Sequence, residues 1–119
     1  MSDEKITVYH NPRCSKSRAA CEIVASIGRP AQIINYLDTP PSKAELHELL
    51  LKLGMKAEAL VRKGEETFKQ HYADQVLSED DWLDALVAHP ILIERPIVVR
   101  GERAVIGRPT EKVQELLAD

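Results

Sequence analysis

The sequence contains few of the features that mark specialised classes of protein. Its 119 residues include only five glycines and seven prolines, which excludes a collagen-like or low-complexity chain. The longest apolar runs, at residues 49–51 and 91–93, are far shorter than the roughly 18 residues that a membrane-spanning helix needs. We therefore expect one soluble domain over residues 1–119 and no membrane as a partner.

An excess of positive charge is also missing. Sixteen basic residues stand against nineteen acidic ones, giving a net charge of -3, so we expect no nucleic acid partner. Residues 1–5 are polar and acidic, unlike a secretory signal, and we expect a cytoplasmic protein. The two cysteines, Cys14 and Cys21, are too few for a disulfide framework. In a reducing compartment each is either inert packing or a reactive nucleophile.

The first third of the chain has the pattern of a strand, a helix and a second strand. Residues 5–9 alternate polar and apolar side chains, as a strand does. Apolar residues after Ser15 recur at helical spacing until Gly28, where we expect the helix to end. Residues 31–37 are predicted to form a second strand, mostly buried. A unit of this size is typical of a right-handed crossover, so the two strands should be parallel.

Helical signals dominate the middle of the chain. Ser42 and Glu45 form a capping box for a helix that Gly54 should end. Further helical segments are expected at residues 56–62, at residues 65–72 and after Ser78. We therefore expect an all-helical insertion at about residues 43–89.

The last third combines a hairpin with a helix. Residues 97–99 and 104–106 are apolar and flank a turn at Gly101, which predicts two antiparallel strands. Thr110 is predicted to cap a final helix. The order of elements is then strand, helix, strand, helical insertion, strand, strand, helix. This order predicts an α/β protein with a thioredoxin-like fold and a mixed sheet.

Cys14 stands where a strand has ended and a helix begins. Unpaired backbone N–H groups and the positive end of the helix dipole favour a thiolate at such a position. Arg13, Lys16 and Arg18 should add positive charge, and His10 lies four residues upstream. We therefore predict that Cys14 is a reactive nucleophile rather than a small buried apolar residue.

The second cysteine is not expected to act as a partner for Cys14 as long as the first two turns of the helix stay folded. A thioredoxin-type pair needs cysteine three residues after the first, where this chain has Ser17. Cys21 is seven residues away, roughly 10 Å along a continuous helix, which is too far for a disulfide. We expect Cys21 in the core and predict that the second thiol comes from another molecule.

Three arginines have a noteworthy context. Arg62 is predicted to end a helix, and Arg95 and Arg108 each precede a proline. The planar guanidinium suits oxyanions, although each arginine taken singly is expected to be a solvated surface charge. Pro96 could follow a cis bond. We expect no metal site, because the histidines have no ligand spacing.

Three separated motifs resemble the glutaredoxin-coupled arsenate reductase family. They lie at residues 9–18, 94–99 and 107–109, and the similarity extends to residues 36–41, 59–63 and 89–92. The resemblance implies a thioredoxin fold with a helical insertion, in agreement with the predicted order of elements.

The resemblance also implies a role for individual residues. Cys14 matches the nucleophile that attacks arsenate, and His10 and Ser17 match residues that keep its thiol ionised. Arg62, Arg95 and Arg108 match the arginines that bind the oxyanion, and Pro96 matches a cis-proline. No bound cofactor is implied; glutathione is the cosubstrate and glutaredoxin the protein reductant.

Two alternatives stay open. Ser15 and Lys16 replace the Gly-Thr that usually follows the cysteine in arsenic-detoxifying members of the family, which leaves another oxyanion or a disulfide open as the substrate. Other relatives bind RNA polymerase and regulate transcription without catalysis. Those regulators generally carry a C-x-x-C switch, and Ser17 at the second cysteine position argues against that role.

Overall fold

The computed structural model describes residues 5–28 and 30–118, so the polar segment at residues 1–4 lies outside the described residues. The chain divides into two compact units. The first comprises Met1–Thr39 and Arg95–Asp119, and the second comprises Pro40–Glu94. No helix among the described residues has the length and apolar character needed to cross a bilayer.

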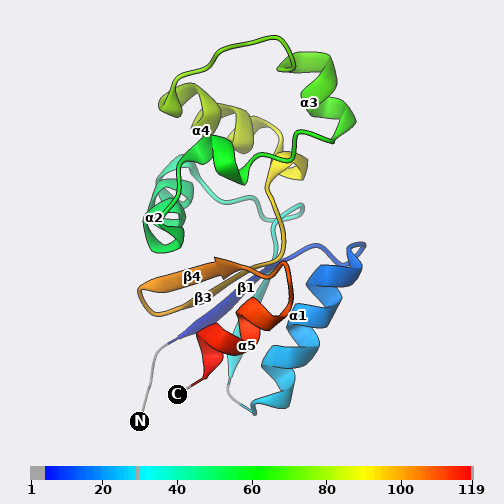
Figure 1. The fold of residues 1–119 in the computed structure, drawn as a ribbon, viewed down its shortest axis with the longest axis vertical. Coiled ribbons are helices and arrows are strands. Elements are labelled where there is room, and N and C mark those ends of the chain that lie inside the picture. The colour runs from blue at the N-terminus through cyan, green and yellow to red at the C-terminus, as the bar shows by residue number, and fades with distance from the viewer. Residues whose placement is uncertain (1–4, 29, 119) are drawn as a thin grey trace. The chain divides into compact units, whose positions relative to one another are not determined.

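The first unit is built on a four-stranded sheet (Figure 1). Its strands are β1 (Ile6–His10), β2 (Ala31–Asn35), β3 (Ile97–Arg100) and β4 (Arg103–Ile106), in the order β2-β1-β3-β4. β1 pairs with β2 in parallel and with β3 antiparallel, and β3 and β4 form the predicted hairpin with Gly101 at φ 58°. The α/β class and the mixed sheet are therefore confirmed.

Two helices cover one face of this sheet. α1 (Ser15–Ser26) and α5 (Glu111–Leu117) lie beside each other and pack on β1 and β3 (Figure 1). The core between them is wholly aliphatic and consists of Ile6, Val8, Ala20, Val24, Val98, Val113, Leu116 and Leu117. Burying these side chains ties the amino end of the chain to its carboxyl end, so residues distant in sequence can share a site.

The second unit contains α2 (Lys43–Leu53), the 3₁₀ helix η1 (Ala57–Leu60), α3 (Glu66–His71), α4 (Glu79–Ala88) and the 3₁₀ helix η2 (Pro90–Leu92). The predicted capping box is present, since the Ser42 hydroxyl accepts from the Glu45 N–H and the Glu45 carboxylate accepts from the Ser42 N–H. Ser78 begins α4 in the same way, with Asp81 as its partner. Gly54 ends α2 in the left-handed region, as predicted.

Three local predictions were wrong. Residues 31–37 are not mostly buried, because β2 is an edge strand and Ile33 is 49% exposed. Residues 56–62 do not form a full helix: η1 ends at Leu60, and Val61 pairs with Ile93 in an isolated bridge. Arg62 therefore follows a bridge rather than a helix, and the insertion is not wholly helical. Thr110 precedes α5 but makes no side-chain capping bond.

Candidate active site

Cys14 occupies the N-cap position of α1, where the loop from β1 enters the helix. Its backbone is extended, with φ -102° and ψ 122°, and its N–H donates to the Asn11 carbonyl at 2.9 Å. The first turn of α1 contains no acidic residue, so nothing in that turn offsets the positive end of the helix dipole. The predicted place of Cys14 between a strand and a helix start is confirmed.

The environment of the sulfur favours a thiolate. Burial raises the pKa of Cys14, but the backbone N–H of Ser17, a hydrogen bond from the Arg95 side chain and the backbone N–H of Lys16 together lower it to about 7. The backbone N–H groups at the start of α1 therefore stabilise the thiolate form of Cys14. A substantial fraction of the Cys14 thiol is therefore ionised at neutral pH.

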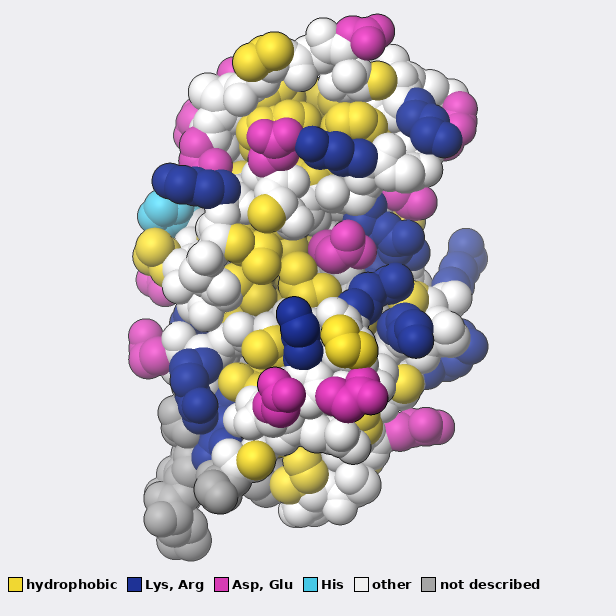
Figure 2. Space-filling model, viewed as in Figure 1, with side chains coloured by type: hydrophobic (Ala, Val, Ile, Leu, Met, Phe, Trp, Pro, Cys, Tyr) yellow, Lys and Arg dark blue, Asp and Glu magenta, His cyan; other side chains and the backbone are white. Residues whose placement is uncertain are grey.

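The neighbouring cations do less than the sequence indicated. Arg13, Lys16 and Arg18 are exposed, and Figure 2 shows Lys and Arg side chains gathered over the N-terminal part of α1. However, Lys16 acts on the Cys14 pKa through its backbone N–H, and Arg13 and Arg18 are not among the causes of the shift. Arg18 instead donates to the Pro12 carbonyl at 2.9 Å. The lowered pKa and its cause at the helix start are as predicted, but the cation whose charge contributes is Arg95 rather than Arg13, Lys16 or Arg18.

Two of the three predicted arginines meet at the sulfur. The Nη2 of Arg108 donates to the Cys14 Sγ at 3.3 Å, while its Nε donates to the Arg95 carbonyl at 2.7 Å. The Nε and Nη1 of Arg95 are buried, and within the described part of the chain neither has a hydrogen-bond partner. Buried guanidinium N–H groups that have no hydrogen-bond partner and lie beside a thiolate can bind the oxygens of a tetrahedral anion.

The backbone around these arginines is tightly packed. The Arg95–Pro96 bond is cis, and so is the Arg108–Pro109 bond, which the sequence did not indicate. The Gly107 N–H donates to the Pro96 carbonyl at 2.8 Å. A Cβ on Gly107 would lie 2.9 Å from the Pro96 Cγ, so only glycine fits beside this proline.

Arg62 lies in the second unit. Its Nε is 3.7 Å from the Glu94 Oε1, and its backbone N–H donates to the Leu92 carbonyl at 2.7 Å. Its Nη1 is buried and has no partner among residues 5–28 and 30–118. The part of Arg62 in an oxyanion site stays a prediction.

His10 and Ser17 flank the loop that carries Cys14. Burial, and then the charge of Arg18, lower the pKa of His10, so its imidazole is neutral at pH 7. The Ser17 hydroxyl is fully buried and accepts the Asn11 backbone N–H at 3.2 Å. The roles that the resemblance implied for these two residues stay predictions.

Cys21 packs against the aliphatic core on the continuous helix α1, and both cysteines are free. Burial raises the pKa of Cys21, which keeps its thiol protonated. Cys21 is half-buried and packs against the core cluster without belonging to it, so the expectation that it lies in the core holds only in part.

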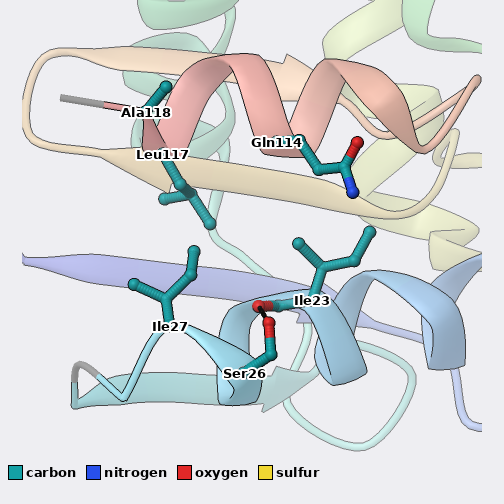
Figure 3. A pocket seen from close by; sticks show the side chains of 6 residues that line it. All are labelled: Ile23, Ser26, Ile27, Gln114, Leu117 and Ala118. Carbon is teal, nitrogen blue, oxygen red and sulfur yellow. Dashed lines mark hydrogen bonds between the residues drawn. The ribbon is translucent and has the colours of Figure 1, made fainter.

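Elsewhere in the described part of the chain, we find fewer side chains that could take part in catalysis or bind a metal ion. A pocket of about 370 Å³ lies between α1 and α5, at the opposite end of α1 from Cys14 (Figure 3). Its lining has no charged side chain and consists of Ile23, Ser26, Ile27, Gln114, Leu117 and Ala118, and the Ser26 hydroxyl donates to the Ile23 carbonyl at 2.7 Å. Within the described ranges, no three His, Cys, Asp or Glu residues are grouped to hold a metal ion.

The sequence matches the ArsC family over residues 9–116. The chain belongs to the ArsC family. An arsenate reductase of Neisseria meningitidis serogroup A is 41% identical over 115 residues, which cover 95% of this chain and 98% of that relative. A relative from Escherichia coli K12 that is named uncharacterized protein YfgD is 43% identical over 116 residues, covering 96% of this chain and 98% of YfgD.

Solved structures agree with this assignment. The structure of an arsenate reductase from Vibrio cholerae matches 98% of this ArsC chain and 100% of its own, with a TM-score of 0.90 and 42% identity. The resemblance to arsenate reductases and the thioredoxin-like fold are therefore confirmed.

Proposed function

We propose that this protein reduces arsenate to arsenite, with Cys14 as the nucleophile. The observation that carries the proposal is the sulfur itself, ionised near neutral pH and contacted by both Arg95 and Arg108. Relatives of similar length that are named arsenate reductases support the choice of substrate.

In the first step, the Cys14 thiolate attacks arsenic and forms a sulfur–arsenic bond. One oxygen ligand of arsenic takes up a proton and leaves as water, and arsenic remains As(V). The buried Nε and Nη1 of Arg95 and the guanidinium of Arg108 would bind the remaining oxygens as charge builds up on them. Arg62 is proposed as the third cation of this site.

His10 and Ser17 are proposed to keep the Cys14 thiol ionised. Because His10 is neutral at pH 7, it would act as a proton acceptor rather than as a cation. Ser17 would act through its backbone N–H, which lowers the pKa of Cys14, while its hydroxyl holds the loop.

The electrons for reduction would come from outside the chain. Ser17 replaces the second cysteine of a C-x-x-C pair, and Cys21 lies within the continuous helix α1 with a raised pKa. We propose that glutathione replaces a second oxygen ligand of arsenic and that glutaredoxin then attacks the glutathione sulfur. That attack forms a mixed disulfide and leaves an electron pair on arsenic, and hydrolysis of As(III) from Cys14 gives arsenite. Because glutathione and glutaredoxin would be its reductants, we propose that the protein acts in the cytoplasm.

The test is arsenite production by the pure protein supplied with arsenate, glutathione and glutaredoxin. We expect turnover that needs all three, that Cys14→Ser abolishes and that Cys21→Ser retains. Absence of arsenite from a protein whose Cys14 is reactive would contradict the proposal and favour another oxyanion or a disulfide as substrate. Recovery of RNA polymerase from a cell extract, without turnover, would favour the regulatory alternative.

A further inference from the structure

Asn11 is a buried polar residue in an otherwise exposed loop. It is 3% exposed, whereas Pro12 and Arg13, which follow it, are exposed. Asn11 has no charge or nucleophilic group that marks it in the sequence, but asparagine is favoured in turns where its side-chain oxygen can accept a backbone N–H. A polar group buried in a loop is normally held by hydrogen bonds, and the bonds of Asn11 all lead toward Cys14.

Three hydrogen bonds connect Asn11 with the start of α1. Its carbonyl accepts the Cys14 N–H at 2.9 Å, which closes a turn over residues 11–14. Its side-chain Oδ1 accepts the Arg13 N–H at 3.0 Å inside that turn. Its own N–H donates to the buried Ser17 hydroxyl at 3.2 Å. Asn11 thus joins the end of β1 to both Cys14 and the first turn of the helix.

This arrangement controls which groups the sulfur faces. The turn fixes the Cys14 backbone in an extended conformation at the N-cap, and the bond to Ser17 fixes the helix turn whose N–H groups lie nearest the sulfur. The ionisation of Cys14 depends on those N–H groups, so a change in the loop should reach the thiolate without any direct contact.

We propose that Asn11 is a positioning residue, whose side-chain oxygen holds the loop so that the Cys14 sulfur faces the backbone N–H groups of Lys16 and Ser17. The inference rests on the proposed role of Cys14 as the nucleophile, but it does not require arsenate to be the substrate.

Asn11→Ala removes the side-chain carboxamide, and with it the bond that Oδ1 accepts from the Arg13 N–H, while the backbone bonds of residue 11 to Cys14 and Ser17 can still form. Arg95 and Arg108 also face the sulfur and stay in place, so the pKa of Cys14 should rise only part of the way to its ordinary value. We expect a rise of about one unit. A change from about 7 to about 8 lowers the fraction of thiolate at pH 7 about fivefold.

The experiment follows Cys14 in a Cys21→Ser background from pH 5 to 10. The readouts are iodoacetamide labelling, measured by mass spectrometry, and the ultraviolet absorbance of the thiolate. Asn35→Ala is the matched control, because the Asn35 Oδ1 makes a similar turn bond to the Leu37 N–H at 3.3 Å after β2. Asn11→Ser is the conservative variant, since a hydroxyl can accept the same turn bond more weakly.

We expect the midpoint to rise in Asn11→Ala, to lie between those of Asn11→Ala and the wild type in Asn11→Ser, and to stay unchanged in Asn35→Ala. If Asn11→Ala does not fold by circular dichroism, Asn11→Gly removes the same oxygen without constraining the backbone and should raise the midpoint too. An unchanged midpoint in the folded variant, or an equal rise in Asn35→Ala, would overturn the inference. The assay contains no arsenate, so a shifted midpoint in a protein without arsenate turnover would refute the proposed function alone.

Discussion

Arg108 makes two contacts that no lysine can make together. Its Nε donates to the Arg95 carbonyl at 2.7 Å and its Nη2 donates to the Cys14 Sγ at 3.3 Å. These bonds hold the rigid guanidinium plane against the sulfur. In Arg108→Lys the charge remains, but a single ammonium on a flexible stem must choose between the carbonyl and the reacting centre.

The kinetic cost should exceed the structural cost. Loss of a donor that acts chiefly in the transition state typically lowers kcat by about 10² to 10³, or roughly 3 to 4 kcal/mol. The lost bond to the Arg95 carbonyl should lower the free energy of unfolding by only about 1 kcal/mol. Since a domain is stable by about 5 to 15 kcal/mol, the variant should still fold. Arg108→Ala should lose more activity, because the charge is removed as well.

The assay is the steady-state rate of arsenite production at varied arsenate, with the fold checked by circular dichroism. Arg103→Lys is the control, because Arg103 is exposed on β4 and should tolerate the change. Wild-type kcat/KM in a folded Arg108→Lys variant would refute the reasoning and remove Arg108 from the oxyanion site.

Three further predictions concern the thiols and the fold. Iodoacetamide should label Cys14 with a midpoint near pH 7, because backbone N–H groups and Arg95 lower its pKa more than burial raises it. Cys21 should react only at more alkaline pH, because burial raises its pKa. Identical pH profiles for the two cysteines would contradict both assignments. Gly107→Ala should lower the free energy of unfolding by about 1 to 3 kcal/mol, because the added Cβ would lie 2.8 Å from the Val113 Cγ2. Thermal unfolding measures this loss, and Gly64→Ala is the control, because a Cβ at Gly64 would meet no atom within 4 Å. Ser42→Ala should lower the free energy of unfolding by about 1 kcal/mol and Thr110→Ala should hardly change it, because the Ser42 side chain makes a capping bond and that of Thr110 does not. Equal losses of stability in denaturant unfolding would argue against this difference.

The features predicted correctly from the sequence are those that neighbouring residues determine. The capping box at Ser42, the left-handed Gly54 and the turn at Gly101 each depend on a few adjacent positions. The parallel pairing of β1 and β2 follows from the connection between them. Ile33 is exposed because β2 lies at the edge of the sheet. β2 is an edge strand because β3 and β4, which are far away in the sequence, add to the other side of β1.

In the candidate site, too, the features set by neighbouring residues were predictable from the sequence, and those set by distant residues were not. The position of Cys14 at a helix start was predictable, because the strand and helix patterns meet there. Arg108 is 94 residues away from Cys14, and its contact with the sulfur arises only because α1 and α5 pack on one sheet. The proline after each of Arg95 and Arg108 does not by itself distinguish them from surface arginines, and only the family resemblance implied that they bind an oxyanion.

The structure also shows that Ser15 and Lys16 are compatible with the proposed role of Cys14 as a nucleophile. Ser15 begins α1, and among the described residues only glycines have a positive φ, so position 15 does not require glycine. At position 16 the group that lowers the pKa of Cys14 is the backbone N–H, which every residue except proline provides. A change of side chain at these two positions therefore leaves the ionisation of the sulfur to the helix backbone and Arg95. What the pair alters is the exposed surface beside Cys14, where Lys16 adds a positive charge that an incoming anionic substrate or thiol would meet first.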